Sequence, residues 1–272
     1  FDTQVVYADI DIERMIIERT LNNSFAFTRP LRDYRQIGID FEETNVKELK
    51  RKFRKSPFVP EDKSERDDFC REIFAIQTTA LAKRLKHINA KHSIIGISGG
   101  LDSTLALIVT ARTYENLGYD MKDIIAVSMP GFGTTKRTKG NAEKLAEKLG
   151  VTFKTIPIEK SVARHFKDIG HDPEKHDTVF ENAQARERTQ ILMDLANKYV
   201  GIVIGTGDLS EIALGWSTYN GDHMSMYGVN AGVPKTLVRY VVNWSAETQY
   251  PGEISKILKD RKSTRLNSSH YS

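Results

Sequence analysis

The chain has 272 residues, with 40 Lys and Arg against 36 Asp and Glu, so its net charge is +4. This near balance argues against a dedicated nucleic-acid-binding protein, which usually carries a concentrated basic stripe. Cys70 is the only cysteine, which excludes a disulfide framework, a cysteine-based zinc site and a CxxC redox pair, and fits a cytoplasmic protein. No apolar run approaches the ~18 residues of a membrane-spanning helix, so we expect no membrane contact. The sequence lacks an initiator Met and a signal-peptide pattern, so we expect a fragment of a longer protein.

The first part of the chain contains a charged, proline-containing segment followed by a helical pattern. Pro57 and Pro60 bracket a short apolar pair, which indicates an extended linker. We interpret the basic cluster within residues 50–55 as a solvated face rather than a nucleic-acid patch. From Ser64 to Ile88 apolar residues recur at helical spacing, which predicts a helix with Ser64 as its N-cap.

Beyond residue 92 short apolar runs alternate with amphipathic stretches. The expected strands cover 93–98, 124–129, 151–158 and 200–206, and the expected helices cover 102–117, 139–149 and 181–199. Gly118 and Gly150 directly follow two of these helices, as C-terminal caps do. The alternation predicts an α/β fold with a doubly wound parallel sheet, covered by helices on both faces. In such sheets ligands bind outside the carboxyl ends of the strands, so polar motifs at those ends are the candidate site.

One such motif is Ser98-Gly99-Gly100-Leu101-Asp102-Ser103, which follows a predicted strand and opens a predicted helix. Two glycines allow the backbone to approach a pyrophosphate, the free amides at a helix start point at the anion, and the serines supply hydroxyl donors. The Asp102 carboxylate suits Mg²⁺ that bridges phosphate oxygens. No Lys follows the glycines, so this is not a kinase or GTPase P-loop. The alternative is an ordinary strand-to-helix turn with an Asp N-cap.

The S-G-G-x-D-S pattern resembles the signature of the N-type ATP pyrophosphatases, which cleave ATP between the α and β phosphates. The resemblance implies their fold, the adenine nucleotide alpha-hydrolase type. Further segments follow in order at 129–135, 182–188, 205–211 and 215–223, and Lys235 comes twelve residues after His223. With the first motif they resemble the synthetase domain of the NAD synthetase family, over about residues 90–258. The resemblance implies that ATP activates the carboxylate of nicotinic acid adenine dinucleotide, and that ammonia then attacks the acyl-adenylate to give NAD⁺ and AMP.

The same resemblance assigns roles to individual residues. It implies Asp102, Glu211, Lys235 and Asp222 as catalytic residues, with Asp102 and Glu211 as ligands of Mg²⁺. The residues implied to bind ATP are Ser98, Gly99, Gly100, Leu101, Asp102, Ser103, Met129, Thr206 and Lys235. Those implied to bind the dinucleotide are Asn182, Arg186, Arg188, Trp216, Tyr219 and His223. ATP and Mg²⁺ are thus the expected cofactors, and a homo-oligomer is expected as well.

Each assignment has a structural alternative. Glu211 could be an ordinary first-turn acid of a helix, and Lys235, expected on a mobile loop, could be a solvated lysine. Arg186 and Arg188 could be surface charges of a helix. Trp216 and Tyr219 could stack on a substrate ring or lie in the core.

The segment from Tyr7 to Phe25 resembles the end of a nitrilase-like glutaminase domain. The domain organisation expected from the resemblance has 1–45 as a C-terminal remnant of that domain, 46–63 as linker, 64–260 as a truncated synthetase domain and 261–272 as a non-matching, disordered tail. The glutaminase active site would then precede Phe1, so we expect the chain to depend on free ammonia, with Cys70 structural.

Two other functions compete with this hypothesis. Another N-type ATP pyrophosphatase, such as a tRNA- or purine-modifying enzyme, would require a cysteine pair or a basic RNA-binding stripe, and the sequence has neither. A nucleotide-binding module without catalytic activity is the second alternative.

Overall fold

The computed structural model describes residues 5–22, 24, 35–38, 54, 56–132 and 136–260, and only the backbone of 136–139. The chain divides into two compact units, Phe1–Lys52 and Phe53–Ser272. The first unit contains helix α1 (Ile12–Leu21), which has no buried residue and is capped by Asp11, whose carboxylate accepts the Arg14 N–H at 2.9 Å. The predicted tail (261–272) and half of the predicted linker (46–63) lie outside the described residues.

The second unit is built on a parallel sheet of five strands in the order β3-β2-β1-β4-β5. Its strands are β1 (His92–Gly96), β2 (Ile124–Ser128), β3 (Thr152–Thr155), β4 (Gly201–Gly205) and β5 (Tyr227–Gly228). In the register, Ile94 of β1 lies beside Ile125 on one side and Val203 on the other.

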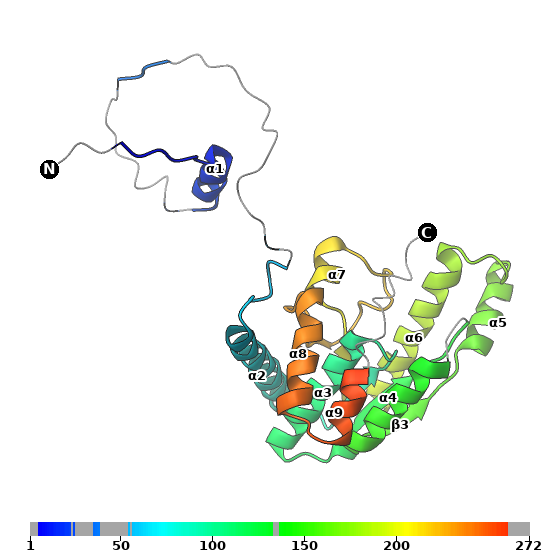
Figure 1. The fold of residues 1–272 in the computed structure, drawn as a ribbon. Helices are drawn as coiled ribbons and strands as arrows, with labels where there is room; N and C mark the ends of the chain where they lie inside the picture. Colours follow the sequence, from blue (N-terminus) through cyan, green and yellow to red (C-terminus); the bar gives the residue numbers. More distant parts are fainter. Residues whose placement is uncertain are drawn as a thin grey trace. The chain divides into compact units, whose positions relative to one another are not determined.

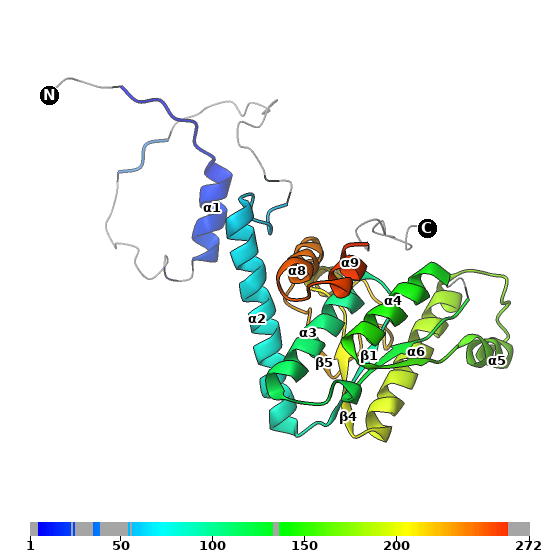
Figure 2. The same ribbon diagram turned by 60° about the horizontal axis from the view of Figure 1, so that its bottom comes forward.

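Helices cover both faces of this sheet, as the doubly wound prediction requires. The helices described in this unit are α2 (Lys63–Ile88), α3 (Leu101–Leu117), α4 (Lys136–Leu149), α5 (Glu159–Ile169), α6 (Thr178–Lys198), α7 (Leu209–Leu214), α8 (Lys235–Thr248) and α9 (Glu253–Asp260), with a short 3₁₀ turn at Met121–Asp123; α7 lies outside both buried clusters. Successive residues of a strand point to opposite faces of the sheet and so belong to two different buried clusters. Ile95 packs in the cluster with α2, α3, α4, α8 and α9, whereas Ile94 packs with α5 and α6. Figure 2 shows α3 and α4 along one side of the strands, with α6 on the other.

Most predicted elements occur close to the predicted positions, and Gly118 and Gly150 adopt the expected left-handed backbone. Ser64 as the N-cap of α2 is wrong: the cap is Asp62, whose carboxylate accepts the Glu65 N–H at 2.9 Å and so satisfies an amide that the helix itself leaves free. The strand expected over 151–158 is shorter in the structure, where β3 ends at Thr155, yet the backbone N–H of Ile156 still donates to the Ser128 carbonyl at 2.9 Å.

The strand order puts the candidate site at a topological switch point. From central β1 the chain runs through α3 to β2 on one side, whereas β4 pairs with β1 on the other. The carboxyl ends of β1 and β4 are therefore adjacent, and α3 and α7 begin just beyond them (Figure 1). Such a position is where open α/β sheets bind their ligands.

The close pairing of β1 and β4 leaves no room for a side chain at Gly201. An alanine Cβ there would lie 2.6 Å from the backbone carbonyl oxygen of His92, which cannot move without disturbing the strand. We expect Gly201→Ala to lower the free energy of unfolding by about 1–3 kcal/mol, measured by urea denaturation. The matched control is Gly140→Ala in α4, where nothing lies within 4 Å of the added Cβ; it should stabilise by about 0.5–1 kcal/mol. Equal effects of the two substitutions would contradict this packing.

Candidate active site

The loop between β1 and α3 is held by its own hydroxyl groups. Gly99 has a φ of 88°, a backbone conformation that favours glycine. The Ser98 hydroxyl accepts the Gly100 N–H at 3.2 Å, and the Ser103 and Thr104 hydroxyls donate to the Gly100 carbonyl at 3.1 and 2.8 Å. Gly100 is the N-cap of α3 and has no side chain to cap the helix. The alternative with an Asp N-cap is therefore wrong, and the first turn of α3 keeps the geometry that binds anions.

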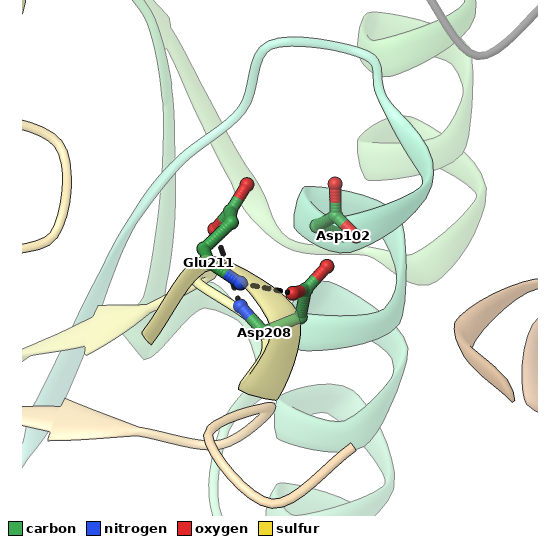
Figure 3. A group of neighbouring side chains, drawn as sticks. All are labelled: Asp102, Asp208 and Glu211. Carbon is green, nitrogen blue, oxygen red and sulfur yellow. Dashed lines mark hydrogen bonds between the residues drawn. The ribbon is translucent and has the colours of Figure 1, made fainter. Parts of the chain in front are cut away.

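Three carboxylates meet beyond the ends of β1 and β4. Asp102 lies in the first turn of α3, Asp208 is the N-cap of α7, and Glu211 lies in the first turn of α7. Each offers one oxygen, and these oxygens lie within 4.8 Å of one another. Figure 3 shows the side chains side by side, although about a hundred residues separate Asp102 from the others. The predicted pair Asp102 and Glu211 is thus brought together. In the part of the chain that the structure describes, no other such acidic, histidine or cysteine group occurs.

Asp208 is the member that the sequence analysis missed. It is fully buried, and it forms a capping box with Glu211. Its Oδ1 accepts the Glu211 N–H at 3.0 Å, while Glu211 Oε2 accepts the Asp208 N–H at 3.2 Å (Figure 3). Glu211 is therefore a first-turn acid of a helix, as the structural alternative states, and it also belongs to the carboxylate cluster. The signal for Asp208 was present in the sequence, as an Asp followed three residues later by Glu.

One ammonium group faces all three carboxylates. Lys235 Nζ lies 2.7 Å from Asp102 Oδ2, 3.1 Å from Asp208 Oδ2 and 3.5 Å from Glu211 Oε1. The expected mobile loop is wrong, because Lys235 is the first residue of α8 and its N–H donates to the Ser210 hydroxyl at 3.1 Å. The solvated-lysine alternative is wrong as well. Pro234 precedes Lys235 as N-cap and favours a helix start at this point.

The titration of these groups reflects their burial. Burial raises the pKa of Asp102 above its ordinary 3.8 and that of Glu211 above 4.5, and the charge of Lys235 opposes both shifts. Burial acts against the Lys235 ammonium, yet the hydrogen bond from Lys235 to Asp102 and the carboxylate charges raise its pKa above 10.5. Lys235 therefore stays charged at neutral pH. One ammonium for three carboxylates leaves the cluster net negative when all are ionised, which suits a divalent cation.

A buried asparagine joins the two loops that carry the carboxylates. Asn230 has no exposed surface, and its Nδ2 donates to the carbonyls of Asp102 and Thr206, each at 3.0 Å. Gln77 of α2 donates to Asn230 Oδ1 at 3.1 Å and to the Val229 carbonyl at 2.8 Å. These neutral hydrogen bonds hold the start of α3 and the end of β4 at a fixed separation.

Met129 and Arg188 form a second part of the candidate site beside β2. Met129 is 8% exposed, and its carbonyl accepts a hydrogen bond from Arg188 Nε at 3.3 Å. Arg188 is half-buried, and burial lowers the pKa of its guanidinium. The surface-charge alternative is therefore wrong for Arg188, whose stem is packed in the molecule.

Helix α6 also contacts the turn at 215–223. Asn182 Oδ1 accepts the Thr218 hydroxyl at 2.7 Å, and Arg186 Nε donates to the Tyr219 carbonyl at 3.1 Å. Within the turn, Asp222 Oδ1 accepts the Thr218 N–H at 2.9 Å. The predicted substrate residues of α6 are thus joined to those of the turn.

The aromatic residues of this turn lie at the surface. Trp216 is 58% exposed and Tyr219 is 83% exposed, so the core alternative is wrong for both. His223 Nδ1 lies 2.7 Å from the Thr218 carbonyl. The turn adjoins α7 through the Trp216 N–H, which donates to the Glu211 carbonyl at 2.9 Å. Asp222 and His223 contact Thr218 rather than the carboxylate cluster.

The fold and the site together define an α/β nucleotide-binding domain, with a glycine-containing anion loop and a carboxylate cluster at its switch point. Comparison with protein families gives a match to the family described as NAD synthase, over residues 73–264. The chain therefore belongs to the NAD synthase family.

Among curated relatives, the glutamine-dependent NAD(+) synthetase of Mycobacterium leprae is 43% identical over 272 residues, and that of Mycobacterium tuberculosis H37Rv is 40% identical over 273. Both alignments cover 95% of this chain and 40% of the relative, so the chain spans about 40% of the length of these proteins.

Solved structures have the same fold. A glutamine-dependent NAD⁺ synthetase from Acinetobacter baumannii, solved with ADP, superposes with a TM-score of 0.65 at 27% identity, covering 74% of this chain and 37% of that one. An NMN synthetase from Francisella tularensis has a TM-score of 0.59 over 70% of this chain and 73% of that one, and at 24% identity supports the fold alone. Among the described residues, no helix has both the length and the apolar character needed to cross a membrane.

The role of Asn230 can be tested without any substrate. Asn230→Ala removes the donors to two carbonyls, and we expect a loss of about 2–4 kcal/mol in the free energy of unfolding, because these groups become unsatisfied. Urea denaturation measures this loss. The control is Asn197→Ala on the exposed side of α6, which should change stability by less than about 0.5 kcal/mol. A small effect at Asn230 would show that these hydrogen bonds do not hold the two loops.

Proposed function

We propose that the chain catalyses the ATP-dependent amidation of nicotinic acid adenine dinucleotide to NAD⁺, with release of AMP and pyrophosphate. The observation that carries this proposal is the meeting of the anion loop with Asp102, Asp208 and Glu211 in a chain of the NAD synthase family. The names of the relatives supply the product, and the site supplies groups suited to the departing pyrophosphate.

The phosphate side of the reaction falls to α3 and its loop. The backbone amides of Leu101, Asp102 and Ser103 form the start of α3, where a negatively charged oxygen is stabilised. The Ser98 and Ser103 hydroxyls, 3.3 Å apart, add donors beside it. Thr206 follows β4 at the same edge of the sheet, and we assign its hydroxyl a contact with the nucleotide.

Asp102 and Glu211 would hold Mg²⁺, with Asp208 beside them. Asp102 Oδ1 is buried without a hydrogen-bond donor, Asp208 Oδ2 faces the Lys235 ammonium at 3.1 Å, and three hard carboxylate oxygens are ligands that Mg²⁺ prefers. When bound, Mg²⁺ supplies neutralisation of the triphosphate charge and of the leaving pyrophosphate. Lys235 adds a mobile ammonium that can follow the charge to the phosphates.

The acceptor side of the reaction would lie along α6 and the 215–223 turn. We assign binding of the dinucleotide to Asn182, Arg186, Arg188, Trp216, Tyr219 and His223, and we assign contact with adenine to Met129. Exposed aromatic rings at 216 and 219 can stack on a planar ligand. Asp222 would bind ammonium and favour delivery of ammonia to the acyl-adenylate. In this arrangement the activated carboxyl and the nitrogen nucleophile meet beside the phosphate loop.

The predicted glutaminase remnant, the cytoplasmic location and the homo-oligomer remain part of the proposal, since the described residues do not test them. The same holds for the dependence on free ammonia. That dependence is tested by replacing ammonium with glutamine, which is expected to give neither AMP nor NAD⁺ with this chain.

The central test is an assay of the 272-residue chain with ATP, Mg²⁺, the dinucleotide acid and ammonium. AMP and NAD⁺ should form in equal amounts, because one acyl-adenylate gives one of each. Chromatography of both products is the measurement. Pyrophosphate release that does not require the dinucleotide acid would favour another ATP pyrophosphatase, and nucleotide binding without turnover would favour a non-catalytic module.

Substitution of the proposed metal ligands should abolish most of this activity. We expect Asp102→Asn and Glu211→Gln each to lower kcat/KM by about 100-fold or more, since each removes a charged ligand while keeping the side-chain shape. Asp194→Asn, an exposed acid of α6, is the matched control and should retain full activity. Activity of Asp102→Asn close to that of the control would exclude the proposed role of this cluster.

A further inference from the structure

The ammonium of Lys235 lies where a metal ion would have to bind. Its Nζ contacts one oxygen from each of Asp102, Asp208 and Glu211, at 2.7, 3.1 and 3.5 Å. Mg²⁺ binds carboxylate oxygens at roughly 2.0–2.1 Å. An ion that uses these oxygens and the ammonium therefore exclude one another.

The cluster has more capacity for cations than the ammonium uses. Asp102 Oδ1 is buried and accepts no hydrogen bond, and the fully buried Asp208 has the Lys235 ammonium 3.1 Å from its Oδ2. Asp208 also has a fixed position, because its Oδ1 caps the backbone of Glu211. This cap holds the Asp208 carboxylate independently of the ammonium, so that a second cation can take the place of the first beside it.

Lys235 itself is able to move. Its side chain is 34% exposed, and its hydrogen bonds within the cluster are made only through the terminal Nζ of a flexible stem. Asp102, its nearest partner, lies in the same helix turn that would bind the phosphates, so a short movement of Nζ reaches them. Phosphate oxygens would give the displaced ammonium a new anionic partner.

We propose that Lys235 is an exchangeable internal cation, which competes with the divalent metal for the three carboxylates until a nucleotide triphosphate takes up its ammonium. Metal and nucleotide then favour each other's binding. The nucleotide draws the ammonium away from the carboxylates, and the metal occupies the carboxylates that would otherwise hold the ammonium. Free metal alone must leave the ammonium without a partner in a half-buried position. This inference rests on the proposed function, and it adds that the binding of the metal and the binding of the nucleotide depend on each other.

The test uses Mn²⁺ as the probe and the full 272-residue chain. Electron paramagnetic resonance measures free Mn²⁺ during titration, with and without a non-hydrolysable ATP analogue. Without nucleotide, Lys235→Met should bind Mn²⁺ at least about tenfold more tightly than the unsubstituted chain, because a competing unit charge within a few ångströms is removed. The factor by which the analogue increases the affinity for Mn²⁺ should therefore be smaller in Lys235→Met than in the unsubstituted chain.

Two further variants control for charge. Lys235→Arg keeps the cation and should bind nucleotide-free Mn²⁺ as the unsubstituted chain does. Lys83→Met changes an exposed lysine of α2 and lowers the net charge equally; it should have no effect. Tighter binding in Lys83→Met equal to that in Lys235→Met would overturn the proposal, as would unchanged or weaker binding in Lys235→Met.

Thermal unfolding shows whether a folding defect of Lys235→Met accounts for its Mn²⁺ binding. Without its ammonium the cluster repels itself, so Mn²⁺ should raise the Tm of Lys235→Met more than that of the unsubstituted chain. An equal or smaller rise would contradict the inference even if the variant is unstable. If no Mn²⁺ binds to the unsubstituted chain even with the analogue, the proposed function fails as well. If that complex forms and only the effect of Lys235→Met is missing, the inference about Lys235 alone fails.

Discussion

The arrangement of the candidate site depends on the attraction between one ammonium and three carboxylates. Like charges this close repel one another, and burial makes the repulsion stronger than it would be in water. Asp102 comes from α3, Asp208 and Glu211 from the start of α7, and Lys235 from the start of α8. The ammonium therefore joins three helix starts at one edge of the sheet. A site that concentrates negative charge in this way is prepared for a cation and for the phosphates that accompany it.

Neutral hydrogen bonds complement this charge. Asn230 fixes the distance between the start of α3 and the end of β4, and the capping box of Asp208 fixes the orientation of Glu211. The contacts of Asn230 go to backbone carbonyls, whereas those of Lys235 go to carboxylates through the end of a flexible side chain. The site thus combines a rigid frame of amides and capping carboxylates with one flexible ammonium. This division suits a reaction in which charge moves from the substrate to a leaving pyrophosphate.

The part of the candidate site that we propose to bind the acceptor is built differently. Here α6 positions the 215–223 turn through side-chain contacts to Thr218 and to the Tyr219 carbonyl, and the aromatic rings of the turn lie exposed. The match to the NAD synthase family covers both the anion loop and this turn. The chain covers 40% of its curated relatives, so the activity is proposed for the site that it carries.

The sequence by itself determined the α/β class, the glycine-containing loop that opens a helix and the family, because local patterns predict them: apolar strands, helical spacing and glycines at fixed offsets. It also paired Asp102 with Glu211, although only through resemblance. The Asp208–Glu211 capping box and Pro234 before Lys235 are local patterns that the sequence contains. The tertiary structure alone decided that Asp208 and the Lys235 ammonium meet Asp102, and that Asn230 bonds the Asp102 carbonyl. These contacts join residues more than a hundred positions apart, and no local pattern of residues contains that information.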